Sequence, residues 1–437
     1  MPKRKAAVSW QKKLEVVVEQ WDEVISVIYD DSKSVGKDTR VSISLYPGIT
    51  YQSTVKKFLD MIAAANNAKF TGDGTAAVGN DTYVRVTPNG ERTRVYFSML
   101  EPRIAEIHGL DTLGTVFNDV ESIRQSLNTE YETDLGRYKC RVLIGISPVT
   151  LIAYRDIGFD KYFHPQVGDE LFIVVEETSG LCSDDITTIV DAFLFELNSS
   201  HSLVLTRNSY PDSTDYWGWF ENAEKIATEL GVNQVLRLKP LIGVSGTGQL
   251  LSLYTRATTA EDIEFAFLNY VKVIEFVSVT VERLSLHNEL RNQLLDERVQ
   301  SPDADYISEI VDTISNLKNK YSKDFERLTT AVVECCDLKL FVDLFPKYLK
   351  QARKELRSGD VEQVTNGTRS VAQSLISTRN ELSHAKPNYS ATGSECPAAE
   401  FPSLTALAKR IAESCIRWYL GLDPKKRVSR GSRKKTF

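Results

Sequence analysis

The 437-residue sequence lacks several features by which the location or chemistry of a protein is often recognised. It has no run of 18 or more apolar residues, so we expect no transmembrane helix and no membrane partner. The basic N-terminus lacks the apolar stretch of a secretory signal. The six cysteines show neither CxxC nor zinc-knuckle spacing. Reduced thiols and a cytoplasmic location are therefore expected.

The usual signatures of metal and cofactor binding are also missing. The five histidines show no HxH, HxxxH or HExxH spacing, so we expect no metal site. The segment 34–39, SVGKDT, lacks the upstream glycine and the following hydroxyl of a phosphate-binding loop. The segment 243–248, GVSGTG, is glycine-rich but lacks the strand-then-helix context of a dinucleotide site, so we interpret it as a loop. No cofactor is expected.

The net charge of −6 argues against general nucleic-acid binding, but this average hides a polarised distribution. The last fourteen residues, PKKRVSRGSRKKTF, carry seven lysines and arginines and no acid. Without them the net charge is −13, so any contact with RNA must use local basic patches.

The first 255 residues show a mixed pattern of helices and strands. Residues 8–30 have helical spacing of apolar positions, and 183–198 resemble a helix capped by Ser183. Two alternating, β-rich runs flank Asn89-Gly90, which predicts a hairpin with a type I′ turn. Strands are also predicted within 40–48, 138–147, 170–177, 202–207 and 235–245. This region matches no family on its residues, and we expect it to sense or regulate.

The pattern changes near residue 258, where a long helix capped by Thr259 is predicted. Helices alone follow to residue 424. We therefore expect an α+β region over 1–255, with one or two subdomains, an all-α domain over 256–424, and a basic, disordered tail over 425–437.

One stretch of the helical domain, STRNELSHAKPNY at 377–389, carries a candidate catalytic pair. Asn380 and His384 are four residues apart and share a helix face, so the amide can fix the imidazole tautomer. Pro387 predicts that the helix stops near Ser383–Ala385, leaving His384 accessible at a helix end that favours its protonated form. A histidine poised near neutrality suits acid–base catalysis.

The position of Arg379 sets a geometric condition on this pair. On an ideal helix, side chains five residues apart point about 140° away from each other. Arg379 and His384 of one chain therefore do not converge unless the helix end distorts or two chains line one cleft. A helix terminus with ordinary polar residues remains the competing interpretation.

The stretch resembles the R-N-x-x-x-H signature of the HEPN superfamily. The segments FLNYVKVIEFV at 267–277 and LTALAKRIAESCIRWYLGL at 404–422 are also similar to the opening and closing helices of that family. The resemblance covers about 259–424 and is nearest to HEPN domains of bacterial defence and abortive-infection proteins. Toxins of this superfamily that pair with a nucleotidyltransferase antitoxin have a tyrosine two places after the histidine, where this chain has Lys386.

The resemblance implies a homodimeric, metal-independent endoribonuclease that acts as a toxic effector in anti-phage defence. Arg379 would then bind the scissile phosphate, His384 would act as general base or acid, and Asn380 would hold His384. The 2′-hydroxyl of RNA would serve as the nucleophile, giving 2′,3′-cyclic phosphate and 5′-hydroxyl ends and leaving DNA uncut. Activity would await a trigger or regulator that contacts the N-terminal region.

Two further features could support such a site. The segment 345–359 spaces four cations three or four residues apart, which predicts a basic stripe able to contact RNA phosphates or simply to face solvent. Its members are Lys347, Lys350, Lys354 and Arg357. Glu275 lies among apolar residues of the long helix and is a candidate partner for Arg379.

Two alternatives to this function remain open from the sequence. The helical region could be a non-catalytic HEPN module that dimerises or binds a nucleotide or a protein in a regulatory complex. A nuclease could instead lie within residues 1–255, with the helices serving for dimerisation.

Overall fold

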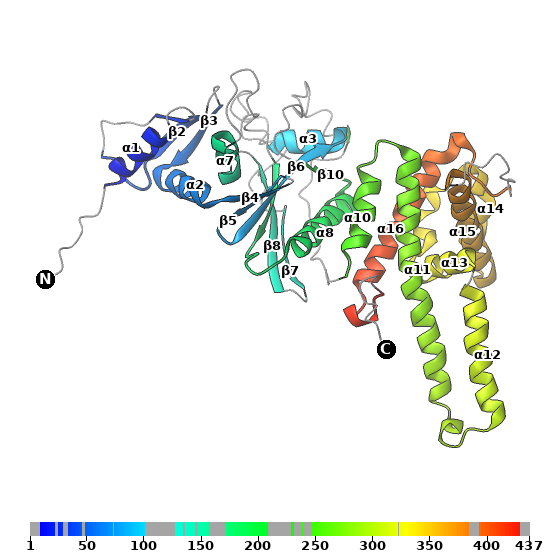
Figure 1. Ribbon diagram of the computed structural model, residues 1–437. Helices are drawn as coiled ribbons and strands as arrows, with labels where there is room; N and C mark the ends of the chain where they lie inside the picture. Colours follow the sequence, from blue (N-terminus) through cyan, green and yellow to red (C-terminus); the bar gives the residue numbers. More distant parts are fainter. Residues whose placement is uncertain are drawn as a thin grey trace. The chain divides into compact units, whose positions relative to one another are not determined.

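The structure is a computed structural model of the chain (Figure 1). It describes residues 9–21, 25–28, 34–45, 49–72, 74–100, 127–133, 136–144, 147–156, 171–208, 229–230, 238, 246–321, 323–383 and 393–428. The chain divides into two compact units, one of residues 1–131 and 136–240 and one of residues 132–135 and 241–437. The boundary expected at 255–256 thus falls inside helix α10 (Gly248–Thr258) of the second unit.

The N-terminal half mixes helices with antiparallel sheet, and the C-terminal half is helical, as the sequence predicts. Within the described ranges, no strand follows Arg207. None of the described helices combines the length and the apolar character needed to cross a bilayer.

Two sheets form the framework of the first unit. The smaller has the order β1-β2-β3, and the larger has the order β4-β5-β6-β9-β8-β7 with β10 also paired to β6. Their bounds are β1 (Ile25–Ile28), β2 (Arg40–Leu45), β3 (Ile49–Thr54), β4 (Lys69–Gly72), β5 (Thr75–Val78), β6 (Asp81–Asn89), β7 (Asn128–Thr133), β8 (Gly136–Ile144), β9 (Leu171–Glu176) and β10 (Val204–Arg207). Of the strand predicted at 235–245, all residues but 238 lie outside the described residues.

Strand β6 organises the larger sheet. It pairs with β9 along one edge, whereas β5 and then β10 follow each other along the other edge. The registers place Thr75 opposite Val84 and Arg207 opposite Val86, so β10 continues the sheet where β5 ends.

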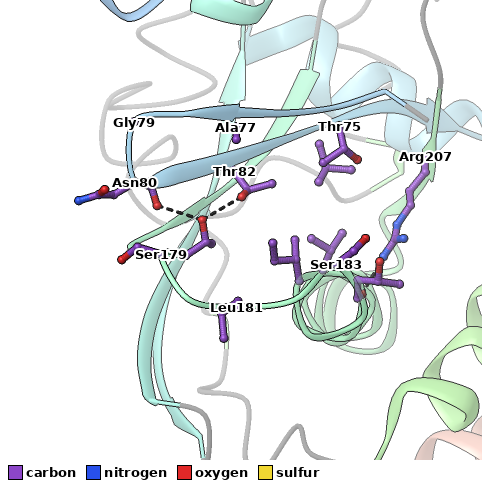
Figure 2. Close-up of a pocket in the computed structure, with 14 residues that line it drawn as sticks. Thr75, Ala77, Gly79, Asn80, Thr82, Ser179, Leu181, Ser183 and Arg207 are labelled. Atoms are coloured by element: carbon purple, nitrogen blue, oxygen red, sulfur yellow. Dashed lines mark hydrogen bonds between the residues drawn. The ribbon is translucent and has the colours of Figure 1, made fainter. Parts of the chain in front are cut away.

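Helices cover both faces of β5. The described helices of this unit are α1 (Trp10–Gln20), α2 (Val55–Asn67), α3 (Glu91–Leu100), α7 (Pro148–Asp156) and α8 (Ser183–His201). Ala76 and Val78 of β5 join a buried cluster with Val149 of α7. Because side chains alternate along a strand, Thr75 and Ala77 face the other side, where they line a slot with α8 (Figure 2).

The hairpin predicted around Asn89-Gly90 is wrong in its second half. Strand β6 ends at Asn89, Gly90 takes a positive φ of 79°, and helix α3 begins at Glu91. The left-handed turn at Gly90 and the acid in the first helical turn favour this helix start. The β-rich run at Val95–Phe97 is fully buried, so tertiary packing overrides its strand propensity.

Three predicted helix boundaries also need correction. The helix predicted over 8–30 ends at Gln20, and Ile25 begins strand β1. Helix α8 is capped by Cys182 rather than Ser183. The long helix α11 (Ile263–Leu294) is capped by Asp262, whose carboxylate accepts from two backbone N–H groups, whereas Thr259 ends α10.

The second unit is built around α11. Its described α-helices are α10, α11, α12 (Ala304–Tyr321), α13 (Asp324–Cys335), α14 (Lys350–Arg357), α15 (Val361–Ser383) and α16 (Phe401–Leu420). Short 3₁₀ helices are η1 (Glu297–Gln300), η2 (Leu338–Leu344), η3 (Lys347–Leu349), η4 (Ala398–Glu400) and η5 (Pro424–Lys426). Helix α16 packs on α11 with ring contacts from Phe267 to Phe401 and from Phe276 to Tyr419.

The start of the basic tail is folded against α16. Arg427 is 8% exposed and donates to the carbonyls of Leu420 and Leu422, which the helix end leaves free. Val428 donates its backbone N–H to Thr280 of α11. The disordered tail expected over 425–437 therefore does not include residues 425–428, and the remainder lies outside the described residues.

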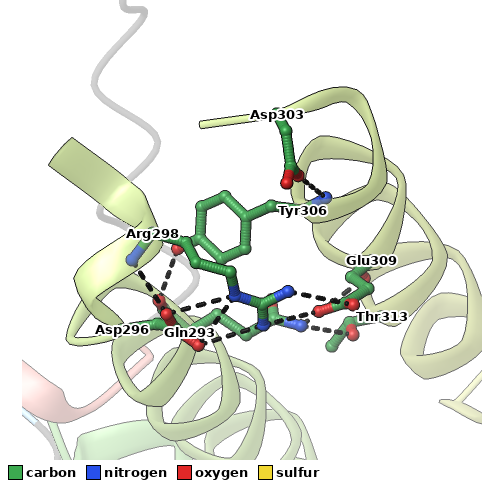
Figure 3. A network of polar contacts seen from close by, with 7 residues as sticks. All are labelled: Gln293, Asp296, Arg298, Asp303, Tyr306, Glu309 and Thr313. Atoms are coloured by element: carbon green, nitrogen blue, oxygen red, sulfur yellow. Dashed lines mark hydrogen bonds and ion pairs between the residues drawn. The ribbon is translucent and has the colours of Figure 1, made fainter. Parts of the chain in front are cut away.

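Helices α11 and α12 form a long antiparallel arm (Figure 1), closed at its tip by a polar network (Figure 3). Arg298 of η1 bonds Asp296 on one side and Glu309 of α12 on the other, at 3.0 and 2.9 Å. Its guanidinium also lies 4.9 Å from the ring centre of Tyr306, whose hydroxyl donates to the Gln293 carbonyl. Arg298 thus ties the turn to α12, and Tyr306 ties α12 to α11.

Replacing Arg298 with alanine is expected to increase amide exchange in η1 and in the first turn of α12. The hydrogen bonds from Arg298 lower the pKa of Asp296, so the carboxylate form is favoured in the folded tip. This stabilisation is present above the unfolded-state pKa of about 3.9 and is lost as pH falls below it through the lower folded pKa. Amide exchange measured against pH should therefore show that the protection of the tip falls in acid for wild type.

An exposed-arginine control, Arg291→Ala, should keep wild-type protection from exchange. Equal exchange in the Arg298→Ala and Arg291→Ala variants would contradict the role of Arg298.

Candidate active site

The helix that carries the Arg-Asn pair, α15, ends at Ser383, where Pro387 predicts a stop. Thr378 is 1% exposed and faces the core, whereas Arg379 and Asn380 are half-buried in the last turn. His384 follows the helix directly and lies outside the described residues. Its proximity to Arg379 therefore stays a prediction.

The guanidinium of Arg379 is held by groups from two helices. Its Nε donates to Glu275 Oε1 of α11 at 2.9 Å, and its Nη2 donates to the same oxygen. Its Nη1 donates to Asn380 Oδ1 at 2.8 Å. The side chain of Arg379 is 23% exposed and that of Glu275 is 32% exposed, so the pair lies at the surface of the bundle, within reach of a ligand.

Asn380 makes a contact that the sequence did not predict. Its carbonyl oxygen accepts from Arg379, so Asn380 is engaged with its neighbour in sequence. Its amide Nδ2 is not engaged by any described residue. An amide donor can still bond an unprotonated imidazole nitrogen, so the oxygen and the nitrogen of Asn380 can serve Arg379 and His384 together.

A second acid that the sequence analysis missed lies beside Arg379. Asp324, in the first turn of α13, places Oδ2 3.8 Å from Arg379 Nη2 and also pairs with Arg327. No motif marks Asp324, since its approach depends on how α13 packs. Arg379, Arg327, Glu275 and Asp324 together carry no net charge. The site therefore offers directed N–H groups rather than a strong positive field.

Glu275 is expected to position Arg379 for any phosphate contact. Glu275→Ala should free the guanidinium and lower the rate of RNA cleavage by about 10-fold, because a misplaced group loses most of its catalytic benefit. Glu275→Gln keeps an acceptor oxygen for Arg379 and should lower the rate by less than about 3-fold. Single-turnover cleavage rates test this, and equal losses in both variants would contradict a positioning role.

The basic stripe is present but does not form one helix. Lys347 belongs to η3, and α14 begins at Lys350; all four cations are exposed. Arg357 pairs with Asp343 at 3.1 Å, which offsets its charge.

The packing of α14 against α15 sets the distance between the basic stripe and Arg379. Helix α14 meets α15 at Gly367, where a Cβ atom would lie 2.9 Å from the Ala352 carbonyl. Gly367 precedes Arg379 by twelve residues, or about 18 Å along the helix axis. At the other end, the Tyr348 hydroxyl bonds Ser374, only five residues before Arg379. The stripe thus leads toward the motif, with Lys347 at its near end.

The chain after the motif returns to the same end of α15. The backbone N–H of Cys396 donates to Thr378 Oγ1 at 2.9 Å, directly beside Arg379. Burial raises the pKa of the Cys396 thiol and of the Tyr348 hydroxyl, so both remain neutral near pH 7. The sequence gives no signal for these contacts, since they join η3, α15 and the segment before η4.

No group of three or more histidine, cysteine, aspartate or glutamate side chains suited to a metal ion occurs among the described residues. Cys415 of α16 does hydrogen-bond Cys335, the last residue of α13, and Cys336, which follows it, and these bonds, with burial, raise its pKa well above the usual range. All three are free thiols.

Comparison with known proteins found no relative of this chain. No family model matches the chain, and no significant match is found among curated proteins or solved structures. The functional interpretation therefore rests on the residues themselves.

Proposed function

We propose that the protein is a metal-independent endoribonuclease of the HEPN type, with Arg379, Asn380 and His384 as its catalytic residues. The observation that supports this proposal most is the environment of the Arg379 side chain. It is partly exposed, fixed by Glu275 and Asn380, and lies in the last turn of a helix that ends just before His384.

The hydrogen bonds of Arg379 leave it able to bind a phosphate. A guanidinium carries five N–H groups, of which three are donated to Glu275 and Asn380. The remaining two lie on Nη1 and Nη2, and Asp324 Oδ2 is 3.8 Å from Nη2. N–H groups of this kind bind phosphate oxygens, so a phosphate would compete with Asp324 for the second of them. His384 would take the proton of the 2′-hydroxyl or protonate the leaving 5′-oxygen, and a second chain would supply the complementary group.

The biological role follows the family resemblance. We propose a cytoplasmic, homodimeric effector of antiviral defence whose toxicity is released by a trigger recognised by the first unit. The stripe from Lys347 to Arg357 would carry RNA phosphates toward the motif without reading the sequence.

The test compares nucleic acids and product ends. Full-length protein is incubated in EDTA with an RNA and with the DNA of the same sequence. RNA cleavage with 2′,3′-cyclic phosphate and 5′-hydroxyl ends, and intact DNA, is the expected result. Cleavage of both substrates, or loss of activity in EDTA, would overturn the proposal.

One observation favours the non-catalytic alternative. The ion pair with Glu275 offsets the charge of Arg379, as in a structural contact between helices. A module that binds a protein or nucleotide would leave RNA intact in the same assay, so this experiment separates the two functions.

A further inference from the structure

The first unit contains a slot between its larger sheet and the start of α8 (Figure 2). Its volume is about 320 Å³. Strands β5 and β6 form one wall, the first two turns of α8 form the other, and the segment 178–181 closes one end. This volume lies at the small end of the range for ligand sites in proteins.

Small side chains create this space. Thr75 and Ala77 of β5 and Gly79 in the turn after it are every second residue of the chain. They therefore face the same side, toward α8, and all three line the slot. Gly79 has a positive φ of 63°, and a Cβ there would meet no atom within 4 Å. The walls between the polar ends are apolar, with Val84 on the sheet and Ile186 and Val190 on the helix. They suit a flat, thin ligand.

At one end of the slot, a buried hydroxyl can act only as an acceptor. Thr178 Oγ1 donates to the Asn80 carbonyl at 2.9 Å, which uses its single hydrogen. Its 2.9 Å bond with Thr82 Oγ1 must therefore be donated by Thr82. Thr82 is 4% exposed and lines the slot, and its oxygen retains lone pairs for a donor on a ligand.

Across the slot lies Arg207 (Figure 2). Its Nη2 donates to the Thr187 carbonyl at 2.8 Å and to Asp191 Oδ1 at 2.9 Å. Its Nε is buried and has no hydrogen-bond partner among the described residues. Since Asp191 offsets the charge of Arg207, this end of the slot carries no excess positive charge.

We propose that this slot binds a small, flat, uncharged heterocycle of the nucleobase type. The ligand places a hydrogen-bond donor on Thr82, and its ring fills the space between Val84 and Ile186. An anion is disfavoured, because the only guanidinium among the lining residues is paired with Asp191. This site is separate from the proposed ribonuclease site and does not depend on it.

The experiment titrates full-length protein with adenosine, guanosine, cytidine, uridine and inorganic phosphate, followed by calorimetry. At least one nucleoside is expected to bind with a Kd in the micromolar to millimolar range, and phosphate is not. Thr82→Val keeps the shape but removes the acceptor, and should weaken binding about 10-fold or more. The matched control is Thr188→Val on helix α8, outside the slot, which should bind like wild type.

A second variant guards against a folding defect. Ala77→Leu fills the slot with carbon and should abolish binding while the thermal unfolding temperature stays at or above that of wild type. The proposal fails if no nucleoside binds, if phosphate binds in their place, or if Ala77→Leu binds as wild type does.

Discussion

Replacing Arg379 with alanine is expected to lower the rate of RNA cleavage by about 100- to 1,000-fold, the usual cost of removing a group that stabilises transition-state charge. The fold should survive this change. The Arg379–Glu275 pair is partly exposed, and such pairs contribute about 1 kcal/mol or less to stability. Loss of activity with a nearly unchanged unfolding midpoint would therefore assign Arg379 to catalysis rather than to structure.

Helix α15 supplies a matched control. Arg369 lies ten residues earlier, is half-exposed and pairs with Glu326 of α13 at 3.5 Å. Arg369→Ala removes the same charge and a similar ion pair, so it should retain near-wild-type cleavage. Arg379→Lys keeps the charge but loses the fork, and should recover little activity. If Arg369→Ala and Arg379→Ala slow cleavage equally, the loss reflects charge alone.

Replacing Glu413 with alanine is expected to destabilise the helical unit by about 3 kcal/mol. Glu413 of α16 is 5% exposed and accepts from the Tyr254 hydroxyl of α10 at 2.8 Å and from Arg410 at 2.7 Å. Burial raises the pKa of Tyr254 well above its usual range, so its hydroxyl stays protonated and needs an acceptor. Without Glu413 this hydroxyl loses its 2.8 Å acceptor inside the bundle.

Urea unfolding followed by circular dichroism measures this loss. Glu413→Gln retains an acceptor for Tyr254 and should cost about 1 kcal/mol. Combining Glu413→Ala with Tyr254→Phe removes both partners, and should cost less than the two single changes added together. Additive losses would show that the contact between α10 and α16 is not coupled through this bond.

The sequence predicted elements best where one local signal dominated. The end of α15 was predicted closely, because Pro387 stops that helix and α15 ends at Ser383. The sequence analysis failed where packing opposed local propensity, as at Val95–Phe97 in α3. Helix α10 was missed because its start follows a glycine-rich stretch that resembles a loop.

Only part of the candidate site could be predicted from the sequence. Arg379 and Asn380 could be identified from the sequence because they are neighbours on one helix. Glu275 could be identified because it is an acid among apolar residues. Asp324 approaches Arg379 only through the packing of α13, and no spacing rule encodes that contact. The same applies to the slot, where Thr82 and Arg207 come from strands far apart in the sequence. Local patterns predict residues on one element, whereas sites between elements require the fold.

The most direct test of the proposed chemistry is single-turnover cleavage of one end-labelled RNA in EDTA by wild type and by His384→Ala. We predict that wild type releases fragments with 2′,3′-cyclic phosphate ends and that the variant is slower by about 100-fold or more, as expected for loss of a general acid or base. Equal cleavage rates for the two proteins, or intact RNA with wild type, would contradict it.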